Sequence, residues 1–162
     1  MADIIKFKSK QQLFKESCRE YTRKEAEAII NYMKPYEIKP PEYLKTGKPQ
    51  RVSFGLTFKK CFDYICNLPE SCPEEIKQQV KLIHGFYYGY PGDIVSELEE
   101  PVIHAWIELP EGIIFDGDLQ RFYKQGEYYR LLGCVKEAEY SIEEAARQVV
   151  NNKNYGIWHK QD

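Results

Sequence analysis

Three residues of types that cooperate in acyl transfer follow one another along the chain: Cys61, then His104, then Asp116. A cysteine attacks a carbonyl group only as the thiolate, so it needs a base that takes its proton. An imidazole can serve as that base, and a carboxylate at its second ring nitrogen fixes its tautomer and orientation. These three types therefore predict a cysteine-dependent acyl-transfer enzyme that hydrolyses a peptide or amide bond through a thioester at Cys61.

Two further side chains lie close to this set in sequence. Asp118 follows Asp116 by two residues, so in an extended strand both carboxylates face the same side, and either could orient the imidazole. Trp106 shares the predicted strand face of His104 and could either line the substrate cleft or pack in the core. Both alternatives stay open at the level of sequence.

The strands that must position these residues can be read from residue type and alternation. Residues 80–89 are rich in β-branched and aromatic types, and residues 101–109 alternate between two faces. A third strand is predicted over residues 112–119, joined to the second by a tight turn at Pro110-Glu111. The three segments predict an antiparallel sheet.

The register of the predicted hairpin decides whether the imidazole meets a carboxylate. With a loop of about three residues, Asp116 or Asp118 stands opposite His104, close enough to hydrogen-bond the ring. A loop of two residues would place Gly117 there instead.

The nucleophile is expected on a helix. Residues 61–68 have helical apolar spacing, with Cys61 near the first turn, where the positive end of the helix favours a thiolate. Residues 52–58 alternate like a short strand or an extended approach to that helix. Helices are also predicted over residues 9–34 and after Ser71 and Ser141, each of which is followed three residues later by a glutamate.

Together these elements predict an α+β fold in which an antiparallel sheet packs against the nucleophile helix. Residues 1–49 are expected to form an N-terminal helical arm and connector, and residues 50–162 the catalytic part with its C-terminal helix. At 162 residues the whole chain fits a single compact domain.

Composition narrows the classes of partner. Lys+Arg 23 against Asp+Glu 25 gives a net charge of -2, unlike the basic domains that bind nucleic acid. Because charged residues stand where a signal peptide needs its apolar core, no signal peptide is expected at the N-terminus. No apolar run is long enough for a transmembrane helix, so no membrane span is expected either. Five cysteines, an odd number without an export signal, predict reduced thiols in the cytoplasm. Their spacing lacks the pairs of a zinc site, so no metal or other cofactor is expected, and the oligomeric state is not predicted.

Several short motifs carry a resemblance to a known group of enzymes. Cys61-Phe62, the segment Gly85-Phe86-Tyr87-Tyr88-Gly89, then His104-Ala105-Trp106-Ile107-Glu108, and finally Phe115-Asp116 stand in the order found in the transglutaminase-like branch of the papain-type cysteine enzymes. The chain also resembles small bacterial and phage members of that branch, over roughly residues 50–125. It departs from them in having Tyr64 where Asn is common and Gly117-Asp118 where Pro-Thr is common.

The resemblance implies a transglutaminase-like core, with Cys61 as nucleophile, His104 as general base and Asp116 as the orienting carboxylate. It implies a peptide or protein substrate and no cofactor. No glutamine lies shortly before Cys61, so backbone N–H groups such as its own would have to receive the oxyanion. Three alternatives remain. One is an inactive domain of the same fold that binds a partner protein, and another is an effector that deamidates or transamidates protein glutamine. The third is an unrelated α+β binding protein in which the His-Ala-Trp motif is coincidental and Cys61 and His104 lie far apart.

Overall fold

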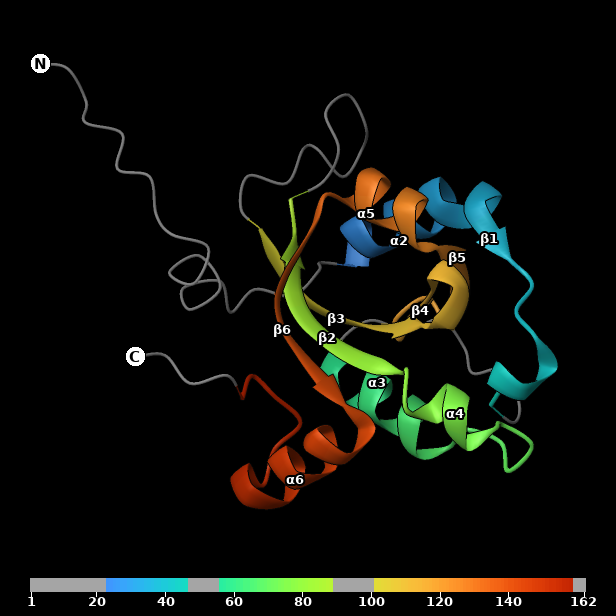
Figure 1. Ribbon diagram of the computed structural model, residues 1–162. Helices are drawn as coiled ribbons and strands as arrows, with labels where there is room; N and C mark the ends of the chain where they lie inside the picture. Colours follow the sequence, from blue (N-terminus) through green and yellow to red (C-terminus); the bar gives the residue numbers. More distant parts are fainter. Residues whose placement is uncertain (1–22, 47–55, 89–100, 159–162) are drawn as a thin grey trace, which may run out of the picture.

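Residues 23–46, 56–88 and 101–158 are described by a computed structural model of the chain. They form a mixed helix and strand fold around one six-stranded sheet (Figure 1). In chain order the helices and strands are α2 (Arg23–Met33), β1 (Glu37–Ile38), α3 (Thr57–Cys66), α4 (Glu74–Lys77), β2 (Lys81–Tyr87), β3 (Val102–Leu109), β4 (Ile113–Asp116), β5 (Arg121–Lys124), α5 (Gln125–Leu132), β6 (Cys134–Ser141) and α6 (Ile142–Asn152).

The sheet is antiparallel throughout, in the order β1-β5-β4-β3-β2-β6. β3 therefore lies between β4 and β2, and its residues are almost all buried. A strand covered on both faces needs apolar side chains on both, which is what Val102–Leu109 provides on either side of His104.

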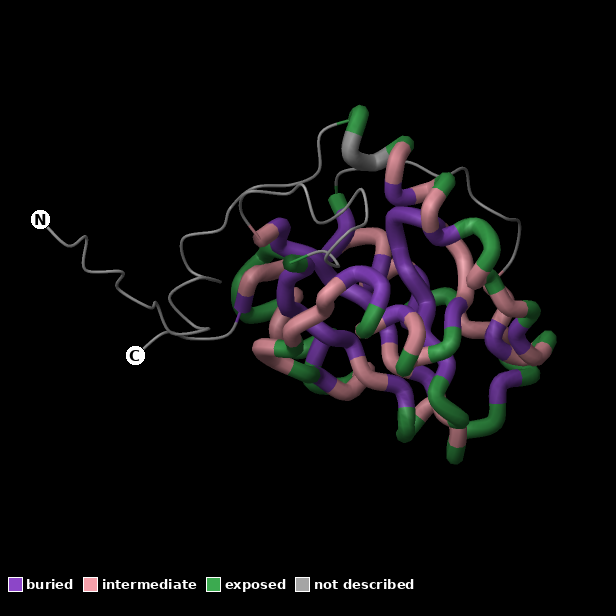
Figure 2. Tube along the Cα trace, turned by 90° about the horizontal axis from the view of Figure 1, so that it is seen from above, coloured by how far each residue is buried: buried purple, intermediate pink, exposed green. Residues whose placement is uncertain are grey.

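Helices cover both faces of the sheet. α2 and α5 lie over one face, and α3 and α6 lie over the other (Figure 1). Each layer encloses its own group of buried side chains: Ile83, Trp106 and Ile114 face α2 and α5, whereas Leu82, Ile107 and Phe115 belong to the group that includes residues of α3 and α6. β2, β3 and β4 are almost entirely buried. Buried positions gather in the interior of the molecule and exposed ones at its periphery (Figure 2).

The N-terminal segment contributes to this core. β1 pairs with β5, and Ile29 and Met33 of α2 are buried in the same group as Trp106. The helix predicted over residues 9–34 is confirmed for Arg23–Met33, and Pro35 then lies in a short 3-10 turn, Lys34–Tyr36. Residues 9–22 of that prediction lie outside the described residues.

The predicted strands and hairpin are confirmed as β2, β3 and β4, and the α+β class with them. The hairpin loop is Pro110–Gly112, with Glu111 at φ 64° and Gly112 at φ 69°. This three-residue loop pairs Trp106 with Asp116 and thereby sets the register of the ladder.

Three predictions at element ends need correction. The third strand ends at Asp116, because the following residues turn away from the sheet, and not at Leu119. The helix that carries Cys61 begins at Thr57, so Thr57 and Phe58 are helical instead of extended. α4 begins after Pro73 with no side-chain cap from Ser71, whereas the Ser141–Glu144 capping box of α6 is confirmed.

None of the helices in the described ranges is long and apolar enough to cross a membrane.

Candidate functional site

His104 lies between two carboxylates at the point where β4 leaves the sheet. Its Nε2 atom is 3.1 Å from Oδ2 of Asp116, and its Nδ1 atom is 3.5 Å from Oδ2 of Asp118. All three side chains are at most 3% exposed. Because Trp106 pairs with Asp116, His104 is the diagonal neighbour of Asp116 on the same face, two residues beyond the last pair of the ladder.

A turn brings the second aspartate to the ring. Oδ1 of Asp116 accepts hydrogen bonds from the backbone N–H of Asp118 at 2.8 Å and of Leu119 at 2.9 Å. Asp residues commonly stabilise turns in this way, by bonding backbone N–H groups two or three residues ahead. The Asp116 carboxylate thus both meets the imidazole and folds Asp118 back toward it.

Two tyrosines complete the set of donors around Asp116. The hydroxyl of Tyr128 donates to Oδ2 at 2.7 Å, and that of Tyr87 donates to the same oxygen at 2.9 Å. The two hydroxyl oxygens also lie against each other, with the single hydrogen of each directed to Asp116. Donors surround both oxygens, an arrangement that favours the ionised carboxylate.

The two aspartates differ in their acidity. Burial tends to raise the pKa of Asp116, but the charge of His104 and hydrogen bonds from His104, Leu119 and Tyr128 lower that pKa to about 2. Burial raises the pKa of Asp118 to about 7, with a further increase from the charge of Asp116 and opposing effects of His104 and Lys60. At neutral pH, Asp116 is therefore the ionised partner of the imidazole.

This difference fixes the direction of the His104–Asp116 hydrogen bond. An ionised carboxylate has no proton to donate, so Nε2 of His104 carries the hydrogen and donates it to Asp116. In this tautomer the lone pair of the ring lies on Nδ1. This is the arrangement expected of a general base oriented by a carboxylate.

Helix α3 supplies the groups on the Nδ1 side. Oγ1 of Thr57, the first residue of the helix, is 3.3 Å from Nδ1 of His104. Nζ of Lys60 is 3.5 Å from Oδ1 of Asp118.

Cys61 is four residues after Thr57, one turn further along the helix. Its side chain lies in the buried group on the α3 side of the sheet, whereas His104 shares the opposite strand face with Trp106. Among the described residues no hydrogen bond joins Sγ of Cys61 to the imidazole.

Cys61 is fully buried against the turn that links the two aspartates. A Cβ atom added to Gly117 would lie 2.9 Å from Sγ of Cys61, which shows how closely the turn approaches the thiol. Burial and the charges of Asp116 and Asp118 raise the pKa of Cys61 well above its usual range, against the effects of a hydrogen bond from Gly117 and the charge of Lys60. The resting thiol is therefore neutral.

The helix position of Cys61 differs from the prediction. Cys61 is the fifth residue of α3, and already the N–H of Lys60 is bonded to the carbonyl of Leu56. The backbone N–H of Cys61 is thus committed inside the helix and cannot receive an oxyanion. The N–H groups that precede this bonding belong to the first helical residues, Thr57 to Lys59.

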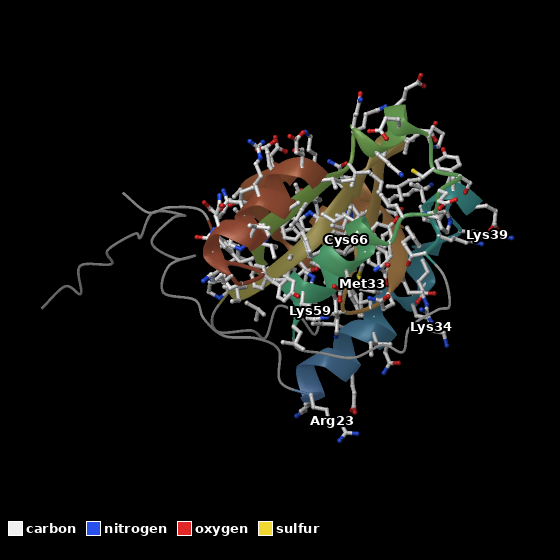
Figure 3. The ribbon with its side chains drawn as sticks, turned by 90° about the horizontal axis from the view of Figure 1, so that it is seen from below. Arg23, Met33, Lys34, Lys39, Lys59 and Cys66 are labelled. Carbon is white, nitrogen blue, oxygen red and sulfur yellow. The ribbon has the colours of Figure 1, made fainter. Side chains whose placement is uncertain are left out.

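The structure also places the other side chains for which the sequence left alternatives. Asp116 and Asp118 both lie beside the ring of His104, each next to a different ring nitrogen. Trp106 is fully buried, its indole N–H donates to the hydroxyl of Tyr129 at 3.2 Å, and it packs in the core beside α5. Cys66 lies on α3 as well but is exposed, on the outer side of the helix with Lys59 (Figure 3).

The spacing of His104, Asp116 and Asp118 also meets the requirement of a metal site, since one ligand atom from each lies within 4.8 Å of the others. The surroundings do not suit a cation. Asp116 already accepts five hydrogen bonds, from two backbone N–H groups, two tyrosines and the imidazole, and the ammonium group of Lys60 adjoins Asp118. A metal ion would have to displace these donors, so the cluster fits proton transfer better than metal binding.

Sequence reasoning missed Thr57, Lys60 and Tyr128 as members of this site. The position of Thr57 could have been found from its spacing of four residues before Cys61, had the start of the helix been known. Tyr87 was noticed only as one of several clustered tyrosines, and its role as a donor to Asp116 depends on the fold.

In comparisons with known proteins, no family model, no curated protein and no solved structure matches the chain.

Proposed function

We propose that this protein is a cysteine-dependent acyl-transfer enzyme of the transglutaminase-like type, with Cys61 as nucleophile, His104 as general base and Asp116 as the orienting carboxylate. The observation that carries the proposal is the hydrogen bond from Nε2 of His104 to the ionised carboxylate of Asp116. It leaves Nδ1, the basic nitrogen, 3.3 Å from Oγ1 of Thr57, the first residue of the helix that carries the cysteine.

The arrangement of elements supports the same family of enzymes. A helix with the cysteine packs against an antiparallel sheet, and neighbouring strands of that sheet carry the histidine and the aspartate. The transglutaminase-like enzymes that the sequence resembles carry their cysteine, histidine and aspartate on the same kinds of element, in the same order along the chain. A transglutaminase-like core is therefore part of the proposal.

In the proposed reaction, Nδ1 of His104 takes the proton of the Cys61 thiol while Sγ bonds to the carbonyl carbon of an amide or ester. The tetrahedral intermediate collapses, the leaving amine or alcohol takes the proton from Nδ1, and a thioester remains. Water or an amine then attacks the thioester with His104 again as base, which restores the thiol. Because burial keeps the resting thiol neutral, proton transfer accompanies attack instead of preceding it.

Burial favours a second candidate function, a catalytically idle domain of this fold that binds a partner protein. Thr57, Cys61, His104, Asp116 and Asp118 are each at most 2% exposed. A substrate carbonyl can reach Sγ of Cys61 only if covering side chains move. In an idle domain the same network would simply satisfy its buried polar groups.

Release of nitrophenol from a p-nitrophenyl acyl ester tests the proposal. We expect turnover by the wild type and its loss in Cys61→Ser and in His104→Gln, each by roughly a hundredfold or more. Cys66→Ser is the matched control, because it removes an exposed thiol from the same helix. Equal turnover in Cys61→Ser and Cys66→Ser would refute the nucleophile assignment and favour the binding module.

A further inference from the structure

Thr57 occupies the position next to the basic nitrogen of His104, although neither mechanism nor sequence assigned it a role. Its Oγ1 atom is 3.3 Å from Nδ1 of His104 and also 3.3 Å from the backbone carbonyl oxygen of Ala105. The residue is 2% exposed, so protein groups rather than bulk water must serve its hydroxyl.

A hydroxyl at this point can serve both protonation states of the ring. It has one hydrogen to donate and lone pairs to accept. When Nδ1 is unprotonated, the hydroxyl donates to Nδ1. When Nδ1 carries a proton, that N–H donates to Oγ1, and the hydroxyl hydrogen turns to the carbonyl of Ala105.

We propose that Thr57 is a positioning residue whose hydroxyl rotates between Nδ1 of His104 and the carbonyl of Ala105, so that Nδ1 has a hydrogen-bond partner both before it takes up a proton and after. During the transfer itself the hydroxyl hydrogen turns to Ala105, which leaves the lone pair of Nδ1 to the thiol. The inference rests on the proposed function, because acyl transfer requires His104 to take up and return a proton. A buried imidazole that lost its partner at either stage would incur the cost of an unsatisfied polar group.

The local backbone holds the hydroxyl in place. Thr57 is the first residue of α3 and follows Leu56, whose φ of 60° and ψ of 30° are left-handed. The side chain is β-branched and therefore restricted in χ1, so Oγ1 stays between its two partners while only its hydrogen moves. Asp118 also adjoins Nδ1, but at the longer distance of 3.5 Å.

Two variants separate the hydroxyl from the shape of the side chain. Thr57→Val replaces the hydroxyl with a methyl group of similar size, and Thr57→Ser keeps the hydroxyl. The readouts are the imidazole nitrogen resonances of His104, assigned by comparison with His104→Gln and followed over pH by ¹H–¹⁵N correlation, and the steady-state kinetics of ester hydrolysis.

In Thr57→Val we expect the Nδ1 resonance of the neutral ring to move toward the position of a nitrogen without a hydrogen-bond donor. We also expect kcat to fall roughly tenfold to a hundredfold, the value of a hydrogen bond to a charged group, with little change in KM. Thr57→Ser should restore both. If Thr57→Val does not fold, Thr57→Ala, which is smaller, is measured in its place with the same expectations.

An unchanged Nδ1 resonance in the valine variant, or kcat within about twofold of the wild type, would overturn the role of Thr57. The two proposals fail separately. If the wild type shows no cysteine-dependent turnover, the proposed function fails, while the nitrogen resonances still decide whether Thr57 is the partner of Nδ1.

Discussion

Replacing Asp118 and Asp116 by asparagine should change the pH dependence of stability in opposite directions. Asparagine keeps the shape of the side chain and removes the charge. The two carboxyls lie on the same imidazole, yet burial raises the pKa of Asp118 to about 7 and the donors around Asp116 lower its pKa to about 2. The comparison therefore tests the assignment of Asp116 as the ionised partner.

The magnitude for Asp118 follows from linkage. A carboxyl whose pKa is 3.8 when unfolded and about 7 when folded binds its proton more tightly in the native state. Its contribution is favourable below about pH 4 and is lost as the pH rises to about 7, by on the order of 3–4 kcal/mol. Asp118→Asn should remove this decline and should be more stable than the wild type at about pH 8.

For Asp116 the sign is reversed. Burial opposes ionisation, but the charge and hydrogen bonds of His104 prevail and lower the pKa from 3.8 to about 2, which corresponds to roughly 2.5 kcal/mol. This stability is present above about pH 4 and is lost as the pH falls toward 2. The free energy of unfolding of Asp116→Asn should lack this decrease at low pH. At neutral pH the variant should be less stable by about 3–5 kcal/mol, because His104, Tyr87 and Tyr128 lose a buried charged acceptor.

Urea unfolding from about pH 2.5 to about pH 8 measures these differences as free energies of unfolding. Glu143→Gln, which removes an exposed carboxyl of α6, is the control for a simple change of net charge. Asp118→Asn would refute the reasoning if it retained the wild-type decline between about pH 4 and pH 7, or if it were less stable than the wild type at about pH 8.

Four further predictions follow from single contacts. Iodoacetamide at about pH 7.5 should alkylate Cys61 at least roughly tenfold more slowly than exposed Cys66, by peptide mass mapping, because burial and two carboxylates raise the pKa of Cys61; equal rates would contradict its burial. Gly117→Ala should lower stability by about 1–3 kcal/mol in urea unfolding, because its Cβ would lie 2.9 Å from Sγ of Cys61. Tyr128→Phe should cost about 1.5–3 kcal/mol in the same assay at neutral pH, since it removes a donor to the charged Asp116, and an effect that persisted undiminished below about pH 2 would argue against that cause. Ser141→Ala should cost about 1 kcal/mol by loss of the capping box, and an unchanged melting temperature would contradict this.

The central hairpin could be predicted because its signals are local. Residues 101–109 are rich in apolar strand-forming types, and Pro110-Glu111-Gly112 supplies the turn, so the register of His104 against the two aspartates depends on the length of the loop. Sequence could not decide between Asp116 and Asp118, because the strand ends between them. The side-chain bonds of Asp116 to the turn bring both carboxylates to one ring.

The start of α3 could not be predicted from the same kind of signal. Val52 to Phe58 alternate as in a strand, and the left-handed residue that precedes the helix is Leu56, a type that rarely adopts that conformation. Packing of Thr57 and Phe58 into the core prevails over their local preference. The partner of Nδ1 was missed with the helix start.

The segment from β5 to β6 was also missed. α5 has only eight residues, and β6 is an edge strand with many half-buried polar positions, so neither has a strong period. Tyr128, which reaches Asp116, belongs to this segment. Its role depends on the packing of α5 against the sheet, which no local pattern encodes.

The most direct test of the central claim is to map the acyl group after mixing the protein with a p-nitrophenyl acyl ester and quenching in acid. Peptide mass spectrometry should place the acyl group on Cys61 in the wild type and should find it strongly reduced there in His104→Gln. An acyl group distributed equally over Cys61 and exposed Cys66, or an unchanged yield at Cys61 without the imidazole, would contradict a thiol activated by the His104–Asp116 pair.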